Sequence, residues 1–427
     1  MKHFNLTLLS LLIGMSFSLQ SCFEDTCQRE LTYIKSTPVY LTAEEIHSIE
    51  IGNEDAKELC QPGKIYYYND YLFINEGREG VHVIDNSVPS NPVNLTFISI
   101  PGSEDIAIKN GRLLANSYTD LLTIDIDDIH NAKLVSRTED VFPPILSTSD
   151  GQLLVYYKNE EVTEVVDCDQ VNGFRADALG SFIDVTSGFD NFAGSESAGQ
   201  SAQTGIAGSM ARFSLIGNYL YVVDNNDLHV FSLDGDAAIL VNTVDIGWGI
   251  ETIFPYGDKL FIGSNSGMFI FDNSNPTAPV MLSAFAHARA CDPVFVKDNY
   301  AYVTLRSGNA CQGFVNQLDL IDITDLTNPV LLKTFPMHNP QGLSIKGNHL
   351  FLCEGEQGLK SFDITNPLQL GDNLLDQVKG FDAFDVIALP GAETNLLVIG
   401  KDGFYQFNAD KPSDLMQISF LGKNNCE

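Results

Sequence analysis

The stretch GVHVIDNSVPSNPV, residues 80–93, has close copies further along the chain. Residues 267–280 read GMFIFDNSNPTAPV, residues 317–330 read QLDLIDITDLTNPV, and residues 358–367 read GLKSFDITNP. Each copy is a short, mainly apolar run that ends at an aspartate and is followed by Asn, Ser, Thr and Pro. This order is typical of a β-strand that ends in a turn. Its recurrence indicates a repeat fold.

The aspartate at the end of each run has a structural interpretation. Asp85, Asp272, Asp322 and Asp363 occupy this position. A carboxylate there can accept hydrogen bonds from the backbone N–H groups of the following turn. We therefore interpret these aspartates as turn residues rather than as metal ligands or catalytic acids.

A second recurring feature is a turn residue followed by a short apolar strand, as in NDYLFI (69–74) and GDKLFI (257–262). Most of these landmark strands are spaced by about 40 residues, a period typical of four-stranded propeller blades. Their aligned residues are Leu72, Leu113, Leu153, Leu220, Leu260, Ala301, Leu350 and Leu396. The sequence thus predicts an all-β fold, a β-propeller of eight blades with four antiparallel strands each. Seven blades is the alternative, if the irregular third unit, which contains Leu153, does not complete a blade.

The chain divides into three parts on this prediction. Residues 1–21 are expected to be a lipoprotein signal peptide and residues 22–60 a lipid-anchored tether. Residues 61–427 are expected to form the propeller, with an insertion at about 170–207. Within the tether, the strand-like stretch LTYIKSTPVYL (31–41) is expected to add an outer strand to the last blade and so close the ring.

The N-terminus has the features of an export signal. Lys2 precedes an apolar run over 6–19, which is too short to cross a bilayer as a helix, since that takes about 20 residues. The run ends in LQSC, so Cys22 resembles the lipidated cysteine of bacterial lipoproteins, although Gln20 departs from the usual small residue. A plain secretory signal is the alternative. The resemblance implies an outer-membrane lipoprotein of the bacterial cell envelope, and acidic residues after Cys22 suit exposure at the cell surface.

The charge balance argues against some classes of partner. The net charge is −32 and the pI is about 4.3. The chain has no basic stripe that could neutralise phosphates, so nucleic acid is not an expected partner. Attraction to an anionic membrane surface is disfavoured for the same reason. The expected membrane contact is the lipid on Cys22.

The sequence contains no familiar catalytic or cofactor motif. H-E-x-x-H, the P-loop, G-x-G-x-x-G and C-x-x-C do not occur. We expect no cofactor, no metal and no catalytic residue. The favoured function is a non-catalytic binding or scaffold propeller with an envelope protein as partner. The alternatives are a binder of a small ligand or glycan, and an enzyme that uses Glu251 and Asp292 as acid and base.

Candidate ligand-binding residues are those where the inner strands begin, because inner strands line the channel of a propeller and its loops surround the mouth. Hydrated polar residues without a ligand are the alternative. Trp248, the single tryptophan, suits a platform for a sugar ring, but a packed anchor is the favoured interpretation. The candidates are Lys64, Asp105, Arg212, Trp248, Glu251, Asp292, Gln341 and Asp385.

The cysteines suggest two disulfides, since an exported chain can form them. Cys291 begins an expected inner strand and Cys311 lies in a loop on the same face, so these two are one candidate pair, with a free thiol pair as the alternative. Cys426 with Cys27 or Cys60 is the other, at the seam between the first and last blades.

The repeated phrases resemble the LVIVD-repeat family of β-propeller proteins. GVHVIDNSVPSNP (80–92), GMFIFDNSNPTAP (267–279) and LDLIDITDLTNP (318–329) carry the resemblance. The longer phrases GSMARF (208–213) and GKDGFYQF (400–407) are similar to a lipoprotein branch of that family. The resemblance implies a propeller fold and a surface location, and its repeat motif supplies no catalytic residue.

Overall fold

The computed structural model describes most of the chain, and the described part is almost entirely strand and turn. Its helices are the short α2 (Ala43–His47) and the 3-10 helix η1 (Pro367–Asp372), and neither is long and apolar enough to cross a membrane. The chain groups into two compact units, one of residues 1–39 with 156–185 and one of the remaining residues. The described residues are 28–167, 206–286, 293–307, 315–391 and 393–424.

The smaller unit contains a sheet of two strands, β1 (Gln28–Leu41) and β11 (Leu153–Asp167). The hydroxyl groups of Thr32 and Thr163 lie 3.0 Å apart across it. Two predictions are corrected here. The stretch 31–41 pairs with β11 and adds no outer strand to the last blade. The strand that Leu153 opens pairs with β1 and is not part of a four-stranded blade, because a strand-like pattern does not specify which edge the strand joins.

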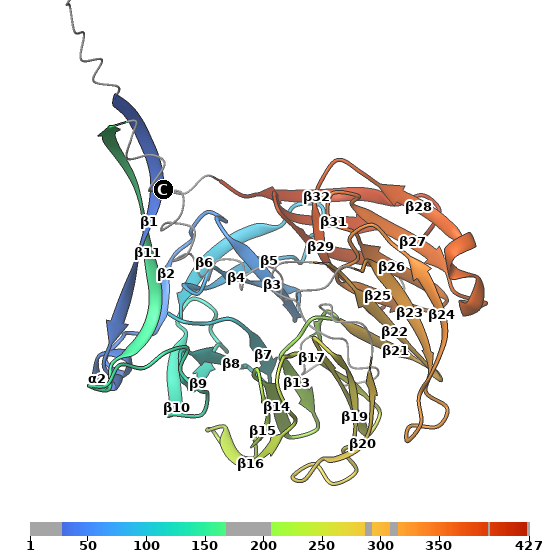
Figure 1. Ribbon diagram of the computed structural model, residues 1–427, viewed down its shortest axis with the longest axis horizontal. Helices are drawn as coiled ribbons and strands as arrows, with labels where there is room; N and C mark the ends of the chain where they lie inside the picture. Colours follow the sequence, from blue (N-terminus) through green and yellow to red (C-terminus); the bar gives the residue numbers. More distant parts are fainter. Residues whose placement is uncertain (1–27, 168–205, 287–292, 308–314, 392, 425–427) are drawn as a thin grey trace, which may run out of the picture. The chain divides into compact units, whose positions relative to one another are not determined.

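The larger unit is a propeller, so the predicted fold class is confirmed (Figure 1). The described residues form eight sheets, as many as the landmark strands, and seven of these contain the four antiparallel strands of a blade. This matches the seven-blade alternative. Three blades are β3 (Pro62–Tyr68), β4 (Tyr71–Glu76), β5 (Gly80–Asp85) and β6 (Val93–Ser99); β7 (Ile106–Lys109), β8 (Arg112–Ser117), β9 (Asp120–Asp125) and β10 (Lys133–Thr138); and β13 (Phe213–Ile216), β14 (Tyr219–Val223), β15 (Asp227–Ser232) and β16 (Ile239–Asp245).

The other four blades follow in chain order. They are β17 (Ile250–Tyr256), β18 (Lys259–Ser264), β19 (Gly267–Asp272) and β20 (Val280–Ala286); β21 (Val294–Lys297), β22 (Tyr300–Leu305), β23 (Gln317–Asp322) and β24 (Val330–Pro336); β25 (Leu343–Lys346), β26 (His349–Cys353), β27 (Leu359–Asp363) and β28 (Leu374–Val378); and β29 (Ala383–Ala388), β30 (Asn395–Gly400), β31 (Gly403–Asn408) and β32 (Met416–Gly422). Two short strands, β2 (Gly52–Asp55) and β12 (Ile206–Ala207), extend the blade β3–β6 at its outer and inner edge.

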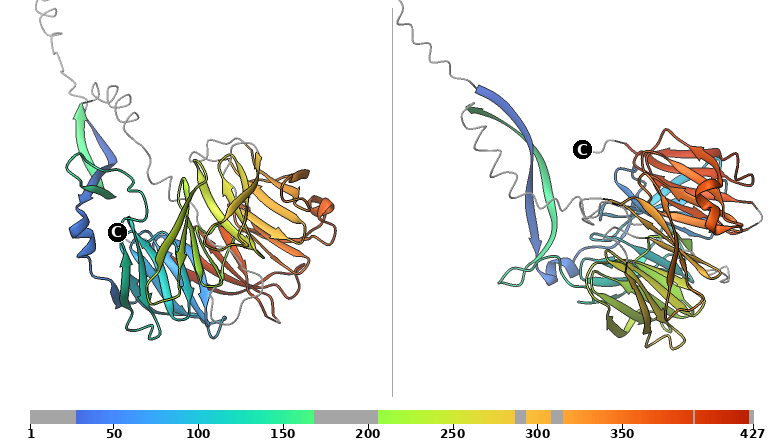
Figure 2. Two further views of the ribbon diagram at one scale, coloured as in Figure 1. Left: turned by 90° about the horizontal axis from the view of Figure 1, so that it is seen from below. Right: turned by 45° about the vertical axis from the view of Figure 1, so that its right-hand side comes forward.

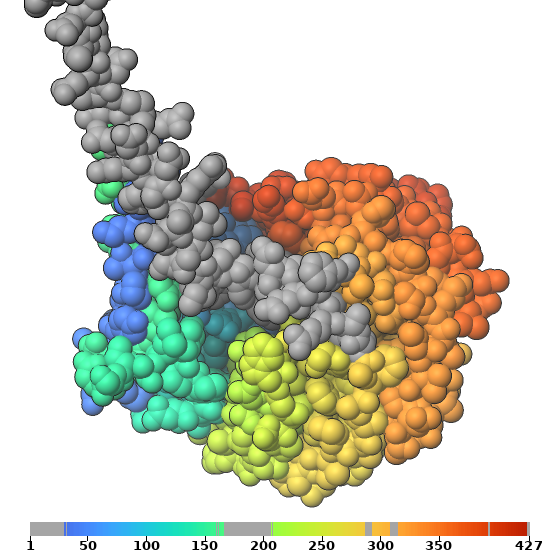
Figure 3. Space-filling view, viewed as in Figure 1, coloured from blue at the N-terminus to red at the C-terminus, as the bar shows by residue number. Residues whose placement is uncertain are grey.

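The blades close into a ring through their inner strands. Each inner strand contacts the next, in the order β3, β7, β13, β17, β21, β25 and β29, and β3 contacts β30 of the last blade. Figure 2 shows the same succession of blades from two other directions. In Figure 3 the blades coloured from green to red lie directly side by side. The core lies between neighbouring blades, where for example the rings of Phe254 and Phe295 have centroids 4.7 Å apart.

Hydrogen bonds of side chains and of the backbone hold the seam between the first and last blades. The amides of Asn86 and Gln406 exchange hydrogen bonds of 3.1 and 2.7 Å, and Asn424 N donates to Leu59 O at 2.8 Å. Cys60, next to Leu59, is disulfide-bonded. The predicted partners Cys27 and Cys426, and the predicted pair Cys291 and Cys311, lie outside the described residues.

The aspartates of the repeated phrase have the structural role that we predicted. The side chains of Asp85, Asp272, Asp322 and Asp363 each accept a hydrogen bond of 2.8–3.1 Å from the backbone N–H two residues later. For Asp85, this turn lowers the pKa below its usual value, mainly through hydrogen bonds from Ser87. The repeated phrase is therefore blade architecture.

A β-bulge recurs between the third and fourth strands of all seven blades. In each, the outer strand holds one residue more than its neighbour, and such an insertion bends and twists the strand. The inserted residue is aliphatic each time. The seven inserted residues are Leu95, Val135, Val241, Leu282, Leu332, Leu375 and Ile418.

Candidate functional site

Four of the predicted channel residues lie at the beginnings of inner strands, as expected. Lys64 is on β3, Asp105 immediately precedes β7, Gln341 lies shortly before β25, and Asp385 is on β29. Their side chains are buried, with no more than 3% of the surface of any of these residues exposed. The channel therefore holds a buried polar network rather than an open polar ring.

Lys64 and Asp105 form a buried ion pair in this network. Lys64 Nζ donates to Asp105 Oδ2 at 2.6 Å, and the same oxygen accepts from the backbone N–H groups of Arg212 and Phe213 at 2.7 and 3.2 Å. Asp105 Oδ1 accepts from Ile106 N at 2.8 Å. Burial lowers the pKa of Lys64 to about 8, although the carboxylate of Asp105 opposes this shift. The carboxylate is thus fully occupied by the chain itself.

Asp385 is the second buried acid. Burial raises its pKa to about 8, although hydrogen bonds from Val386 N and the Ser209 hydroxyl and the charge of Lys64 oppose the shift. The carboxyl group packs so closely on Gly342 that a Cβ there would lie 1.7 Å from Asp385 Oδ1. The neighbouring thiol of Cys353 is buried and free, and burial, together with the charge of Asp385, raises its pKa.

One stretch of chain, residues 206–212, runs through this network, and we call it the channel segment. It begins as β12, which pairs with β3 in the register Ile206↔Tyr67. Further on, Ser209 Oγ accepts from Leu343 N at 2.9 Å and lies 3.4 Å from Asp385 Oδ1. Ala211 O accepts from Ile253 N at 2.7 Å.

The channel segment therefore contacts inner strands on opposite sides of the ring. It touches β3, β17, β25 and β29, and it binds Asp105 at the start of β7 through Arg212 N. Ser209, Met210 and Ala211 are buried. The chain thus passes across its own channel near the beginnings of the inner strands, and the phrase GSMARF (208–213) forms most of this crossing. Local sequence patterns did not reveal it, because the contacts join residues far apart in the chain.

The remaining candidates differ in exposure. Arg212 NH1 lies 3.5 Å from Glu104 Oε2, at the edge of the buried network. Glu251 is half-buried at a bulge in β17. Trp248 is 74% exposed, so the interpretation as a packed anchor is wrong. Asp292 lies outside the described residues, and its pairing with Glu251 in catalysis stays a prediction.

Three blades share an acid–base contact that the sequence analysis missed. An acid at the end of the second strand meets a base near the start of the third: Glu76 with His82 at 2.9 Å, Asp224 with His229 at 2.9 Å, and Glu354 with Lys360. Each acid also accepts backbone N–H groups from nearby loops. The contact ties loops together on the face where the inner strands begin. An acid six or so residues before a basic residue is its only sequence signal.

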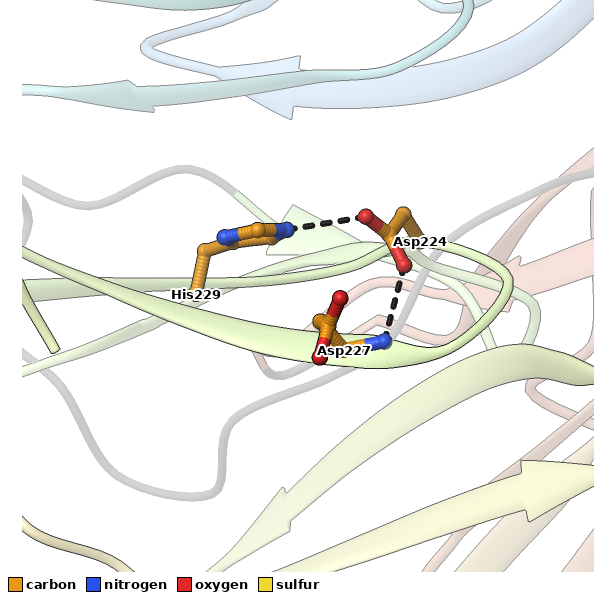
Figure 4. A group of neighbouring side chains, drawn as sticks. All are labelled: Asp224, Asp227 and His229. Atoms are coloured by element: carbon orange, nitrogen blue, oxygen red, sulfur yellow. Dashed lines mark hydrogen bonds and ion pairs between the residues drawn. The ribbon is translucent and has the colours of Figure 1, made fainter. Parts of the chain in front are cut away.

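One of these pairs belongs to a group that could hold a metal ion. Atoms of Asp224, Asp227 and His229 lie within 4.8 Å of one another (Figure 4). Carboxylate and imidazole ligands suit zinc and similar ions. However, the pair Glu76 and His82 makes the same contact in another blade. We therefore interpret the contact of Asp224 with His229 as one of the three acid–base contacts that connect loops on this face, and not as a metal site.

The blades carry a known sequence repeat. Residues 207–231, 252–286 and 288–336 match the LVIVD repeat. The chain contains LVIVD repeats. Two of the third-strand phrases, at 267–272 and 317–322, fall inside these LVIVD regions. None of the curated proteins matches the sequence.

Several solved structures are similar to this LVIVD-repeat chain. The computationally designed Ika8 protein is 8% identical with a TM-score of 0.50, over 87% of this chain and 92% of that one. BamB from Moraxella catarrhalis is 8% identical with a TM-score of 0.47, over 89% and 98%. The N-terminal domain of Nup159 is 10% identical with a TM-score of 0.34, over 49% of this chain, and the chain spans only 61% of that domain. At these identities the likeness concerns the fold alone.

Proposed function

We propose that this protein is a lipid-anchored propeller of the bacterial cell envelope that binds a protein partner as a scaffold, without catalysis. The anchor is a lipid on Cys22, in the LQSC motif at the end of the apolar run over 6–19. Outer-membrane attachment with exposure at the cell surface is part of this proposal. It would place the LVIVD repeats of the larger unit on a tether.

The chain segment that crosses the channel is the observation that carries the proposal. Small ligands of propellers are expected in the central cavity, where inner strands converge. Here the channel segment 206–212 lies in that place, and the charges of Lys64 and Asp105 are satisfied by the chain. A polar network of this kind stabilises the ring. The surface that remains for recognition is formed by the loops and the outer strands, and such surfaces suit a macromolecular partner.

Native co-purification tests the proposal. The tagged, lipidated protein is extracted from envelope with detergent, and mass spectrometry identifies the proteins that come with it. We expect a stoichiometric partner that survives salt washing. Cys22→Ser is the control for the anchor, and it should move the protein from the membrane fraction to the soluble fraction. An empty pull-down from wild-type envelope would contradict the scaffold function.

Two further variants locate the surface that the partner uses. Trp248→Ala changes a loop on the face where the inner strands begin, and Val280→Asp changes an exposed position on the outer strand β20. Loss of the partner with one variant alone would assign the interface to that surface. Both variants should fold, because neither side chain is buried.

A further inference from the structure

The single tryptophan of the chain lies on the surface. Trp248 is in the loop between β16 and β17, residues 246–249, which we call the Trp loop. The residue is 74% exposed, more than any other large hydrophobic residue in the described part of the chain. An indole buries about 150–250 Å² when it packs, so leaving it in water forgoes a large hydrophobic gain. Such exposure needs a physical reason.

The backbone of the Trp loop is tightly held, so the exposure is not a result of a loose chain. Asn226 O accepts from Ile246 N and Gly247 N at 3.0 and 3.2 Å. Asn225 O accepts from Gly249 N and Ile250 N at 2.8 and 3.1 Å. These bonds fix the loop to the neighbouring turn of the blade β13–β16.

A second turn holds the loop from its other side. Asn265 N, in the blade β17–β20, donates to Gly249 O at 2.8 Å. Both glycines that flank Trp248 have positive φ, 126° at Gly247 and 85° at Gly249, a conformation that other residues rarely adopt. A Cβ on Gly249 would lie 2.4 Å from Nδ2 of Asn265. The local sequence G-W-G thus presents the indole outward on a rigid support.

The turns that hold the loop carry amides and carboxylates. Asn225 and Asn226 are exposed, and Asn265 and Asp227 are half-buried. None of the other exposed large apolar residues of the described chain lies in the loop or in these turns. Binding centres for proteins are usually surrounded by further apolar and aromatic groups. A solitary indole among amide groups matches a different ligand, one with an apolar face and a rim of hydroxyl groups.

We propose that the Trp loop binds a carbohydrate, with the indole of Trp248 stacked on the C–H face of a sugar ring. Amide groups both donate and accept hydrogen bonds, so Asn225, Asn226 and Asn265 can pair with ring hydroxyl groups in either direction. The net charge of −32 disfavours anionic sugars, so neutral hexoses and N-acetylhexosamines are the expected class. This proposal does not depend on the protein partner proposed above.

Intrinsic fluorescence tests the proposal without a label, because Trp248 is the only tryptophan. The full chain is titrated with glucose, galactose, mannose, N-acetylglucosamine and their oligomers, and with glucuronic acid as the anionic comparison. At least one neutral saccharide should shift the emission to shorter wavelength and saturate at concentrations of about 1 mM or below. Glucuronic acid should bind more weakly. An unchanged spectrum with every saccharide would overturn the proposal.

Variants separate stacking from folding and from protein binding. Trp248→Ala lacks the fluorescent indole, so its binding is measured as retention on a resin that carries the saccharide bound by the wild type. Retention of Trp248→Ala should weaken at least tenfold, and Trp248→Phe should retain part of the binding. Gly249→Ala should also weaken it, because its Cβ displaces Asn265 from the loop. Retention of Trp248→Ala at the wild-type level would assign the sugar to another site and overturn the proposal. Loss of a co-purified protein from Trp248→Ala, with no saccharide response in wild type, would make the loop a protein interface instead.

Discussion

The channel and the Trp loop differ in which side chains they bury and which they expose to solvent. The channel buries ionisable groups, Lys64, Asp105 and Asp385, around the segment 206–212. The Trp loop exposes an indole on a backbone held by hydrogen bonds from two turns. Polar residues that the sequence marks as binding candidates are buried here, and an aromatic residue expected to be packed is exposed. Exposure, more than residue type, separates the two roles.

The largest expected effect is the loss of the buried carboxylate in Asp105→Ala. This change removes the carboxylate to which Lys64 and the N–H groups of Arg212 and Phe213 donate. Removing one member of a buried ion pair costs about 3–5 kcal/mol. Chemical denaturation should show a loss of this size.

The matched control is the exposed pair of Asp258 and Lys259, which has the same N–O distance of 2.6 Å. Asp258→Ala should cost less than about 1 kcal/mol, because exposed ion pairs contribute little. The double variant Lys64→Met with Asp105→Leu should recover only part of the stability, because it removes the unpaired charge but not the need of the N–H groups of Arg212 and Phe213 for an acceptor. Equal losses in Asp105→Ala and Asp258→Ala would show that the channel pair is not effectively buried.

Stability should depend on pH through the two shifted groups of the channel. The folded chain keeps the proton of Asp385 up to pH about 8, whereas the unfolded chain loses it near its ordinary value of 3.8, so the free energy of unfolding should fall over this range. Lys64 loses its proton near pH 8 when folded but near 10.5 when unfolded, so the free energy of unfolding should rise between these values.

The result is a minimum in stability near pH 8, measurable by urea denaturation in steps of one pH unit. Each pKa unit of displacement corresponds to about 1.4 kcal/mol, so the fall below pH 8 should exceed that amount. Asp385→Asn removes this fall and leaves the rise above pH 8. A wild-type profile with the same slope as the Asn variant between pH 5 and 8 would refute the assignment.

A smaller loss of stability is expected at Gly342, whose backbone is in close contact with the carboxyl group of Asp385. Gly342→Ala places a Cβ 1.7 Å from Asp385 Oδ1, and overpacking of this kind costs about 1–3 kcal/mol. Gly235→Ala is the control, since nothing lies within 4 Å of its Cβ position. Thermal melts of both variants would compare them, and a control that melts below Gly342→Ala would contradict the close packing.

The smallest effect on stability is expected at the exposed site. Trp248→Ala should change the free energy of unfolding by no more than about 0.5 kcal/mol, because the indole has little to lose in contacts. The same variant should lose saccharide binding, so function and stability separate at this residue. A loss of more than 1–2 kcal/mol would mean that the indole packs on the loop after all.

The sequence was sufficient for the blades because each is built from local signals. The strand that ends at Asp272, the turn that follows and the prolines after it lie within one short stretch, and its copies define the period. The strand at Leu153 has the same local pattern but pairs with β1, more than a hundred residues away. Local patterning identifies a strand and leaves its partner open, which is why the sheet with two strands was not predicted.

For the candidate site, too, the sequence predicted the positions of residues but not the contacts that they make. Spacing placed Lys64, Asp105, Gln341 and Asp385 correctly at the beginnings of inner strands. Their burial depends on the segment 206–212, whose contacts reach across the ring and leave no periodic signal. For Trp248, composition favoured packing, because most tryptophans are largely buried. The two flanking glycines were the available sign that the chain turns the residue outward.

The β-bulge in the fourth strand of every blade affects how molecules of this protein would interact when many of them lie close together. An outer strand exposes unpaired backbone groups, and a long flat edge of this kind can pair with the edge of another molecule and start an aggregate. The extra residue, Leu332 in β24 for example, breaks the regular spacing that such pairing needs. On the blade β3–β6 the strand β2 covers the edge as well. Under the lipid anchoring that we propose, neighbouring copies at high local concentration would therefore remain separate molecules.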